Sequence, residues 1–526
     1  MQINFNTFDK FKVDNKFKVF HKDIVTIKDN EVIIEKSNRD KLLLSGVLDN
    51  ISNIIYGYNK QKKIYKLFHP FNKNFPKFLI AQKDEKLLYN KLVVIKYKNW
   101  TNSLPIGIIV KIIDILDYPK INIYSEAILY YNGYYDIKQN NTKYNILKNK
   151  YYDSYKNKLI KNNFNFICNI DPIKCSDIDD VISYKIKNNN SIIGIHICNI
   201  IELFKNLEID YKEIMNTIID NNIYNTIYTY DKRYDIISDE LVNNFISLKV
   251  SEPKYVWSLY LYNKDNIILD YEIKSELIIN KESYSYDEID IILNNKSNIY
   301  LNQISEFCYY QGQTNYKSIY NSYDEHLTNS HYIITILMII YNNYIGNYLK
   351  DNTKTIYKIV DNYESKYIYN DNNNYHSSLN LYNYLHFTSP IRRFIDQYNQ
   401  IILYNKYENK NNILPEIDLN LINESIKDQN ILNNKYNLLK LLKFNNKSKL
   451  IEYNLILENK LRLIWLIDNI KFIDIINIPL IENNRLYNRL NNNKYIDLII
   501  GEYYKLDIRF ELIGSIKMPK ILIDYF

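Results

Sequence analysis

Glycine, proline and cysteine are scarce in this chain of 526 residues, which has 9 Gly, 10 Pro and 4 Cys. Globular proteins average about 7% glycine, so each Gly and Pro that remains is less readily explained as loop filler. The cysteines show neither paired metal spacing nor the density of a disulfide framework, which favours a reducing compartment. Residues with A/T-rich codons are abundant instead, among them 54 Tyr. This skew indicates genome bias and says nothing about the fold.

Long hydrophobic runs are also missing. The most apolar run, residues 332–341, is far shorter than the roughly 18 residues of a membrane-spanning helix. Residues 1–20 mix Asp with Lys and lack the apolar centre of a signal peptide. The sequence therefore predicts a soluble intracellular protein, cytoplasmic or nuclear, with no membrane partner. Its net charge of +7 is compatible with a polyanionic partner without requiring one.

The order of apolar patterns predicts several domains. Short alternating segments separated by turn residues fill residues 1–150 and return near the C-terminus, which is typical of small β-barrels. The region between them mixes strands and helices, including an apolar and therefore buried helix at 329–349. We predict a multidomain α/β protein. Its expected parts are barrels at 1–62 and 63–150, a mixed core with trailing helices at 151–455, and a barrel at 456–526.

Four carboxylates stand within ten residues, at Asp171, Asp177, Asp179 and Asp180. Their mutual repulsion calls for counter-ions, and carboxylate oxygens suit Mg²⁺. Two such ions roughly 3.5–4 Å apart can clamp the attacking and leaving oxygens of a phosphodiester. A solvated acidic loop is the simpler alternative. An EF-hand calcium loop is disfavoured, because its spacing and its turn glycine are absent.

The residues that follow favour a structured site. Residues 181–186 and 191–198 both alternate between apolar and other side chains, which predicts a hairpin with one buried face. Acidic residues at the mouth of a buried strand are held in place by it.

A second candidate segment contains the neighbouring arginines Arg392 and Arg393. A helix is predicted to begin here, with Ser389 at the N-cap and Pro390 at the first helical position. Free N–H groups at a helix start, together with an arginine fork, suit a phosphate. The alternative is that both arginines face solvent or pair with acids.

Together the segments resemble the ribonuclease II and ribonuclease R exoribonucleases, the RNB-domain family, which includes the catalytic subunit of the eukaryotic exosome. Six segments match family motifs in the family's order: 170–172, 177–180, 194–199, 239–248, 284–288 and 386–396. The resemblance covers the core by motif and the flanks only by architecture. It implies two N-terminal cold-shock-type (OB) barrels, a central RNB catalytic domain and a C-terminal OB-type barrel. Unlike the exosome subunit in many eukaryotes, this chain is expected to have no endonuclease domain before residue 1.

The resemblance also implies an activity. The expected reaction is Mg²⁺-dependent hydrolysis of single-stranded RNA from its 3′ end to nucleoside 5′-monophosphates, with two ions at the site. By motif match, Asp171 and Asp180 are direct metal ligands, and Asp177 and Asp179 complete the site. Asp179 matches the carboxylate that the family can least spare. Membership of an RNA-degrading complex stays open.

The remaining expected roles concern RNA. By motif match, Arg392 stabilises charge on the scissile phosphate, and Tyr286 stacks on the 3′-terminal base. Arg393 and Ser389 are expected at the RNA as well. Tyr228 is a further candidate base contact, although a chain so rich in tyrosine makes this match weak.

Two departures from the family leave alternatives open. The family's buried helix carries a Glu pair where this chain has Thr335 and Ile336, and Asn199 replaces an Asp beside the site. An alternative function is therefore a catalytically weak or silent RNA-binding or scaffolding relative. A third is a phosphodiesterase that acts on DNA.

Overall fold

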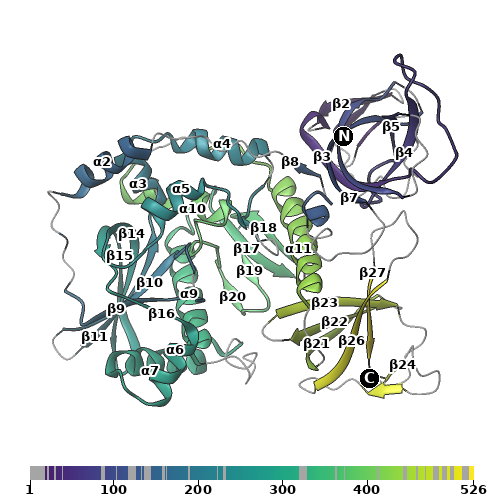
Figure 1. The fold of residues 1–526 in the computed structure, drawn as a ribbon. Coiled ribbons are helices and arrows are strands. Elements are labelled where there is room, and N and C mark those ends of the chain that lie inside the picture. The colour runs from purple at the N-terminus through teal and green to yellow at the C-terminus, as the bar shows by residue number, and fades with distance from the viewer. Residues whose placement is uncertain are drawn as a thin grey trace. The chain divides into compact units, whose positions relative to one another are not determined.

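The structure is a computed structural model. It describes residues 18–20, 23–28, 31–37, 39–83, 89–101, 103–115, 126–131, 133–135, 144–156, 160, 163–173, 175–187, 190–221, 223–228, 233–318, 329–361, 364–371, 373–410, 414–441, 447–457, 460–467, 470–477, 485–487, 495–497, 503–511 and 520–525. The chain divides into two compact units (Figure 1). The first comprises Met1–Ile137, Ile227–Arg233 and Lys427–Phe526, and the second comprises Lys138–Thr226 and Tyr234–Ile426.

The N-terminal strands of the first unit close into a barrel (Figure 1). Six strands pair in the order β4-β5-β7-β6-β3-β8, and β3 also pairs with β4. Closure therefore runs through the five strands β3 to β7, as in an OB-type barrel. The strands of this region are β1 (Ile24–Lys28), β2 (Glu31–Lys36), β3 (Leu42–Leu48), β4 (Ile64–Pro70), β5 (Phe78–Gln82), β6 (Lys91–Asn99), β7 (Ile106–Ile115) and β8 (Tyr134–Tyr135), with a short helical turn at Arg39–Lys41.

The predicted domain boundary at residue 62 falls inside this barrel and is wrong. β3 lies before the boundary, yet it pairs with β4 and β6, which lie after it. Phe20 packs in one core with Phe68 and Phe78. The cause is strand pairing between distant segments, which local turn signals do not reveal. Residues 1–17 of the predicted first barrel lie outside the described residues.

The C-terminal strands form a separate sheet. Five strands pair in the order β23-β22-β21-β26-β27. The predicted boundary at residue 456 falls inside β21, so this sheet already includes Lys447. The elements are α11 (Leu419–Leu441), β21 (Lys447–Leu457), β22 (Lys460–Ile467), β23 (Ile470–Asn477), β24 (Arg485–Tyr487), β25 (Tyr495–Asp497), β26 (Tyr503–Glu511) and β27 (Lys520–Tyr525).

A six-stranded sheet organises the second unit, in the order β15-β14-β11-β10-β9-β16. The predicted hairpin is confirmed as β10 and β11, whose register pairs Ile182 with Ile195 and Tyr184 with Ile193. All four of these side chains are buried in one core, as their alternation predicted. The strands are β9 (Phe166–Ile170), β10 (Asp180–Lys187), β11 (Asn190–Cys198), β14 (Pro253–Lys264), β15 (Ile267–Ile279) and β16 (Glu282–Tyr284).

Helices and a smaller sheet complete this unit. The predicted buried helix is confirmed as α9, with 11 buried residues along its length. A four-stranded sheet has the order β18-β17-β19-β20. The elements are α2 (Tyr144–Tyr155), α3 (Ile200–Leu207), α4 (Tyr211–Asn221), α5 (Asp239–Leu241) with a π-helical turn at Val242–Ile246, α6 (Tyr286–Asn294), α7 (Ile299–Thr314), α9 (Asn329–Tyr348), β17 (Ile356–Asp361), β18 (Glu364–Tyr369), β19 (Tyr375–His376), β20 (Leu381–Tyr382) and α10 (Phe394–Tyr407). The short strand β12 (Ile227–Tyr228) belongs to the first unit, and its partner β13 (Arg233–Tyr234) spans the point in the sequence where the second unit resumes.

Two further observations bear on the sequence predictions. In the part of the chain that the structure describes, no helix has the length and apolar character needed to cross a membrane. Cys168, Cys175, Cys198 and Cys308 are all free of disulfide bonds.

Candidate active site

The acidic segment connects two neighbouring strands of the central sheet, β9 and β10. β9 ends at Ile170, directly before Asp171, and β10 begins at Asp180. The antiparallel register of these strands pairs Ile182 with Cys168, so Asp180 comes beside the end of β9. Strand pairing alone therefore brings Asp171 and Asp180 together.

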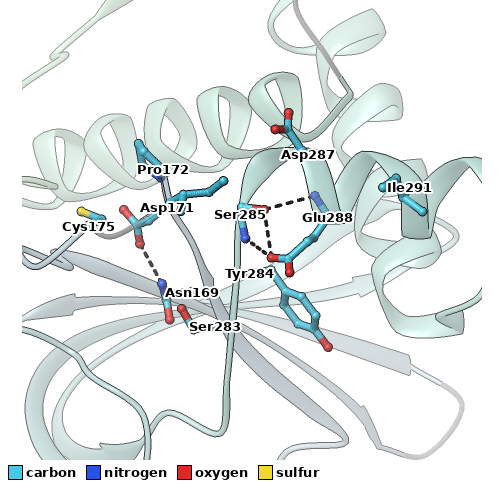
Figure 2. A pocket seen from close by; sticks show the side chains of 11 residues that line it. Asn169, Asp171, Pro172, Cys175, Ser283, Tyr284, Ser285, Asp287, Glu288 and Ile291 are labelled. Carbon is cyan, nitrogen blue, oxygen red and sulfur yellow. Dashed lines mark hydrogen bonds between the residues drawn. The ribbon is translucent and has the colours of Figure 1, made fainter.

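Asn169 orients the Asp171 carboxylate. The buried Asn169 donates a 2.9 Å hydrogen bond from its amide nitrogen to Oδ2 of Asp171 (Figure 2). Its amide oxygen accepts a 2.8 Å hydrogen bond from the side chain of Asn280. Because that oxygen is engaged, the amide nitrogen faces the carboxylate. Sequence reasoning assigned no role to Asn169, since one Asn in an Asn-rich chain gives no signal.

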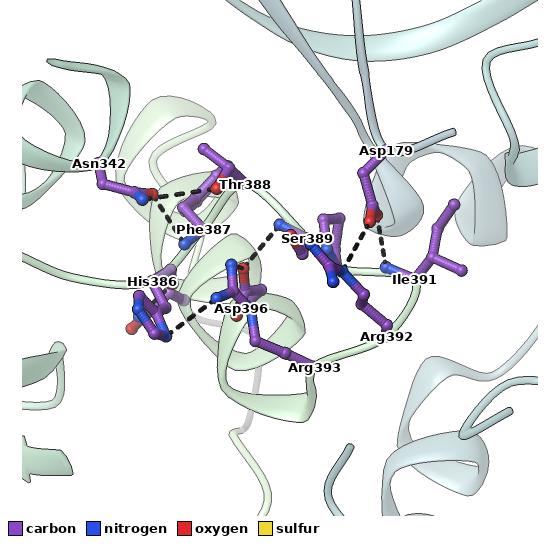
Figure 3. A network of polar contacts seen from close by, with 12 residues as sticks. Asp179, Asn342, His386, Phe387, Thr388, Ser389, Ile391, Arg392, Arg393 and Asp396 are labelled. Atoms are coloured by element: carbon purple, nitrogen blue, oxygen red, sulfur yellow. Dashed lines mark hydrogen bonds and ion pairs between the residues drawn. The ribbon is translucent and has the colours of Figure 1, made fainter. Parts of the chain in front are cut away.

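Asp179 joins the acidic segment to the arginine segment. Its Oδ1 accepts a 2.9 Å hydrogen bond from the backbone N–H of Ile391, and its Oδ2 lies 3.6 Å from Nε of Arg392 (Figure 3). Asp179 is 5% exposed, whereas the side chain of Arg392 is 50% exposed. The two segments predicted to form one site therefore meet at this pair.

The arginine segment at 386–393 is a loop, and the helix start predicted at Ser389 is wrong. α10 begins at Phe394, with Arg393 at its N-cap and no side-chain capping bond there. The backbone N–H of Ser389 instead donates a 2.8 Å hydrogen bond to Oδ1 of Asp396, within the first turn of α10. This contact folds the loop back onto the helix. Phosphate binding by free N–H groups of a helix start at Ser389 therefore does not apply.

Contacts from two other segments hold this loop. Asn342 of α9 accepts a 3.0 Å hydrogen bond from the backbone N–H of Phe387 and donates one of 3.4 Å to Oγ1 of Thr388 (Figure 3). The backbone N–H of Thr226 donates a 2.9 Å hydrogen bond to the carbonyl oxygen of Arg392. The backbone of Arg392 is therefore fixed, while half of its side chain remains exposed.

The two arginines have different surroundings. Nη2 of Arg393 lies 2.8 Å from Oδ1 of the fully buried Asp396, and Nη1 lies 3.2 Å from Nδ1 of His386. Arg392 donates a 3.1 Å hydrogen bond from Nη2 to the hydroxyl of Ser389. Arg393 is thus engaged in an internal ion pair, and Arg392 has the more accessible guanidinium. The predicted RNA contacts of Arg393 and Ser389 stay predictions.

Burial raises the pKa of three of the four carboxyl groups. It raises the pKa of Asp179 to about 7, although Arg392 and the N–H of Ile391 oppose the shift. Burial also raises the pKa values of Asp171 and Asp180, and neighbouring aspartates add to both shifts. The guanidinium of Arg392 lowers all three pKa values, and that of Arg393 also lowers the pKa of Asp179, without cancelling the rise. Ionising these buried carboxyl groups therefore requires more positive charge than the neighbouring arginines supply.

The chemistry of this donor set fits a hard divalent cation such as Mg²⁺, because every donor is a carboxylate and the excess charge is negative. A bound cation would favour the ionised carboxylates and lower their raised pKa values. Among the described residues, no group of three or more His, Cys, Asp or Glu side chains is arranged to hold a metal ion. The predicted two-ion site therefore stays a prediction.

A cavity of roughly 440 Å³ adjoins the acidic segment (Figure 2). Its lining residues are Asn169, Asp171, Pro172, Ile173, Cys175, Ser283, Tyr284, Ser285, Asp287, Glu288 and Ile291. One wall is the start of α6, where Ser285 and Glu288 form a capping box. The Glu288 carboxylate accepts a 2.7 Å hydrogen bond from the Ser285 N–H. This box fixes the first turn of α6, which carries Tyr286.

Tyr286 is tied to the acidic segment through the backbone. β16 pairs in parallel with β9, and the N–H of Asp171 donates a 3.0 Å hydrogen bond to the carbonyl oxygen of Tyr284. Burial raises the pKa of the Tyr286 hydroxyl, and the charges of Asp180 and Asp171 raise it further. The Tyr286 ring stacks on His331, with 3.8 Å between ring centroids and 13° between planes. Sequence reasoning did not identify His331, because a single His on an apolar helix gives no signal.

Asp177 and Tyr228 are the two remaining predicted site residues. Asp177 accepts a 3.6 Å hydrogen bond from the thiol of Cys175, and its charge raises the pKa of Asp171. Tyr228 lies in β12, which belongs to the first unit, and is 38% exposed. The acidic segment belongs to the second unit. The base contact of Tyr228 therefore stays a prediction.

The two departures from family motifs have visible structural roles. Asn199 is the N-cap of α3, and its side-chain oxygen accepts a 3.0 Å hydrogen bond from the N–H of Glu202. Its amide nitrogen donates a 3.0 Å hydrogen bond to Ser275. Asn and Asp cap helices about equally well, so this replacement keeps the cap. Neither Thr335 nor Ile336 has a carboxylate, and in the structure Ile336 is buried in the main core while Thr335 is exposed.

Family comparison decides the classification. The RNB domain matches residues 160–368 and 348–409. The Dis3-like cold-shock domain 2 (CSD2) matches residues 65–133. The chain contains an RNB domain. These matches include both signature segments and most of the N-terminal barrel. They confirm the predicted fold class, a multidomain α/β protein with an RNB core and strand-rich barrel domains.

Curated relatives match less than a quarter of this chain. The exosome complex exonuclease dis3 of Schizosaccharomyces pombe is 29% identical over 125 residues, which are 23% of this chain and 12% of that protein. Ribonuclease R of Chlamydia muridarum is 27% identical over 132 residues, which are 24% of this chain and 18% of that protein. Each match thus spans less than a fifth of the relative's own length.

Solved structures show the same fold over much more of the chain. Mycoplasma genitalium RNase R, in complex with ribose-methylated single-stranded RNA, superposes with a TM-score of 0.65 at 15% identity, over 97% of this chain and 96% of that chain. Yeast Ssd1, a pseudonuclease, superposes with a TM-score of 0.56 at 14% identity, over 88% of this chain and 69% of that chain. The RNB fold therefore occurs both in an RNase and in a pseudonuclease.

Proposed function

We propose that this protein is a Mg²⁺-dependent hydrolytic exoribonuclease that degrades single-stranded RNA from its 3′ end to nucleoside 5′-monophosphates. The observation that carries the proposal is the contact between the two signature segments. The 2.9 Å hydrogen bond from the Ile391 N–H to Asp179 brings Arg392 to the acidic cluster. The names of two curated relatives, an exosome complex exonuclease and a ribonuclease R, support the proposal. The direction of degradation rests on the family resemblance.

Each residue has a distinct role in the proposed reaction. Asp171, Asp177, Asp179 and Asp180 would hold Mg²⁺, which would supply positive charge at the scissile phosphate. The guanidinium of Arg392 donates to phosphate oxygens on which charge develops, in a site where Asp179 is buried and water is partly excluded.

Tyr286 holds the RNA end in this proposal. Stacking of a base on an aromatic ring contributes about 1–3 kcal/mol and tolerates any base, which suits an enzyme that removes successive nucleotides. The ring plane is set by the stack on His331. The capping box at Ser285 fixes the backbone beneath it.

A time course on 5′-labelled single-stranded RNA with Mg²⁺ tests the proposal. The parent should shorten the RNA from its 3′ end and release 5′-mononucleotides, and EDTA should stop the reaction. The Asp179→Asn protein should bind RNA without degrading it, since Asn keeps an oxygen for the Ile391 N–H but loses the charge. Asp270→Asn, on the exposed part of β15, is the matched control and should degrade RNA as the parent does. Equal rates for the parent and Asp179→Asn would refute the assignment.

A second candidate is a catalytically silent RNA-binding relative. It is favoured by the lack, among the described residues, of three side chains arranged around a metal position, and by the apolar Ile336 in place of a family Glu. Intact RNA with a retained gel shift in the same assay would support it. Degradation of an all-deoxy strand would instead indicate a DNA phosphodiesterase, because the 2′-hydroxyl distinguishes RNA from DNA.

We also propose that the protein acts on RNA away from membranes, alone or within an RNA-degrading complex. The complex is suggested only by the names of the exosome relatives. Affinity purification of the full chain from its own cells would test it. Recovery of the chain without other ribonuclease subunits would argue for independent action.

A further inference from the structure

A second group of basic side chains lies beside the arginine loop and has no role in the proposed catalysis. We call it the basic cluster, and its members are Lys358 of β17, His376 of β19, and His386 and Arg393 of the loop. Figure 3 shows Arg393 reaching toward His386 and Asp396, whereas Arg392 reaches toward Asp179. Arg393 therefore belongs to the basic cluster, and Arg392 contacts the acidic segment.

Strand register places Lys358 in this cluster. Lys358 pairs with Tyr367 across β17 and β18, and its Nζ lies 4.4 Å from the centroid of the Tyr367 ring. The Tyr367 hydroxyl lies 2.6 Å from Nδ1 of His386. Arg393 also donates toward that nitrogen, from 3.2 Å. A nitrogen that accepts from a guanidinium carries no proton, so the neutral ring of His386 bears its proton on Nε2.

Lys358 lacks a counter-ion in the part of the chain that the structure describes. No carboxylate there lies within ion-pair distance of its Nζ, and no hydrogen bond from Nζ is formed to described residues. The buried Asp396 is already bonded to Arg393 and to the Ser389 N–H. One positive charge in the cluster is therefore unbalanced.

The surrounding groups respond to this charge. Burial and the charge of Arg393 lower the pKa of Lys358 to about 8. Burial and the charge of Lys358 lower the pKa of His376 to about 4. Burial and the charges of Arg393 and Lys358 also lower the pKa of His386. Burial is the larger cause of each shift, and the smaller contribution from neighbouring cations reflects a local positive potential that an anion would relieve.

We propose that Lys358, together with Arg393 and His386, binds a phosphate group, either of the RNA strand or of the released mononucleotide. The three side chains offer an ammonium, a guanidinium and the Nε2–H of a neutral imidazole, all of them donors. The inference rests on the proposed function, because that function supplies the phosphate. It adds a phosphate position that is separate from the one facing Arg392.

Salt dependence of RNA binding tests the strand phosphate. The full chain carrying Asp179→Asn is titrated with fluorescein-labelled oligouridylate at several salt concentrations, with and without Lys358→Met. Each phosphate contact to a single strand contributes about 0.7 to the slope of log K against log salt concentration. Lys358→Met should lower the magnitude of that slope by about this amount, and Lys358→Arg should restore it.

Lys366→Met is the matched control. Lys366 lies in β18 and pairs with Ile359, so its side chain points to the opposite face of the same hairpin from Lys358. It is exposed. The slope for this variant should equal that of the Asp179→Asn parent. Should Lys358→Met unfold, Lys358→Gln removes the charge with a polar side chain and gives the same comparison.

Inhibition of the active enzyme by uridine 5′-monophosphate tests the product phosphate. If the cluster binds it, Lys358→Met should weaken inhibition by the nucleotide and leave inhibition by uridine unchanged. If Lys358→Met changes the salt dependence of RNA binding, the basic cluster binds a phosphate of the RNA strand. If it changes only the inhibition by uridine 5′-monophosphate, the cluster binds the phosphate of the released nucleotide.

If Lys358→Met folds and alters neither measurement, the inference is overturned, and Lys358 serves only to pack on Tyr367. This outcome leaves the proposed function intact. An Asp179→Asn parent that binds no RNA, together with a wild-type chain that degrades none, would overturn both.

Discussion

The carboxylate of Asp179 accepts a hydrogen bond from the backbone N–H of Ile391, across 212 residues of sequence. Asp179 is fixed because it directly precedes β10, and Ile391 is fixed by a loop that Asn342 holds at Phe387. The bond makes the acidic segment and the arginine loop one structural unit. Changes on either side should therefore affect the function of both.

Replacing Arg392 should slow the reaction much more than it weakens the fold. Its side chain is half exposed, so Arg392→Met should change the free energy of unfolding by less than about 1 kcal/mol. Loss of a donor to developing charge typically costs about 10²–10³-fold in rate. Single-turnover degradation of labelled RNA measures this, and Arg392→Lys should recover part of the loss. A rate for Arg392→Met equal to that of the parent would exclude the assigned role.

Tyr286 should matter for its ring and not for its hydroxyl. Tyr286→Ala should weaken RNA binding by about 1–3 kcal/mol, or roughly 5- to 150-fold in Kd, whereas Tyr286→Phe should keep most of the affinity. Both are measured by fluorescence anisotropy in the Asp179→Asn background. Tyr271→Ala, which removes a 39% exposed ring on β15, serves as the control. Equal affinities for the Ala and Phe variants would contradict base stacking at this position.

His196 should make the protein sensitive to acid. It is fully buried, with Nε2 2.8 Å from the hydroxyl of Ser183 and Nδ1 2.7 Å from that of Ser258. Burial lowers the pKa of His196 from 6.5 to about 3. The unfolded chain therefore takes up the proton first, so this residue's contribution to stability is complete above about pH 6.5 and declines as pH falls toward about 3.

Urea unfolding at pH 7 and pH 4.5 measures this effect. Each fall of one pH unit within this range lowers the free energy of unfolding by at most about 1.4 kcal/mol. Between the two pH values, the free energy of unfolding of the parent should therefore fall by a few kcal/mol more than that of His196→Gln. Gln keeps a donor and an acceptor for the two serines. Parallel losses in the two proteins would show that His196 does not titrate as expected.

Gly346 should resist replacement even though it lies in a helix. Helix propensity favours Ala over Gly by about 1 kcal/mol. A Cβ at Gly346, however, would lie 1.8 Å from the backbone carbonyl oxygen of Asn383. Gly346→Ala should therefore lower the free energy of unfolding by about 1–3 kcal/mol. Thr335→Ala, at an exposed position of the same helix, should be neutral or slightly stabilising. A stabilising Gly346→Ala would show that α9 and the Asn383 loop can separate at little cost.

Mg²⁺ should stabilise the fold as well as support turnover. A ligand at 100 times its Kd stabilises the folded state by about 2.7 kcal/mol. Addition of Mg²⁺ to EDTA-treated protein should raise the melting temperature of the parent and raise that of Asp180→Asn much less. The exposed-site control Asp270→Asn should respond as the parent does. A rise of equal size in all three proteins would place the ion elsewhere.

Elements with local signals were predictable from the sequence. The β10–β11 hairpin and the buried helix α9 follow from apolar periodicity over a few neighbouring residues. Closure of the N-terminal barrel does not, because β3 and β6 are separated by two strands in the sequence. The start of α10 was misjudged for a similar reason. The Ser389 N–H is taken by Asp396 in the folded chain, a contact that capping preferences at Ser389 and Pro390 do not reveal.

Some residues of the candidate site could likewise be predicted from local sequence, and others could not. Asp179 and Arg392 carry motifs that single them out, and the structure brings them together. Asn169, His331 and Lys358 carry no such signal. Asn and Lys are abundant throughout this chain, so their importance depends entirely on which groups surround them after folding.

The parallel pairing of β16 with β9 has a consequence for how far the RNA advances in each cycle. The hydrogen bond from the Asp171 N–H to the Tyr284 carbonyl oxygen joins the two backbones directly. In the proposed enzyme, the ring of Tyr286, which follows β16, contacts the 3′ end of the RNA. The carboxylate of Asp171, which follows β9, acts at the scissile phosphate. The step length is then set by main-chain geometry, so that RNAs of any sequence should be shortened by the same increment.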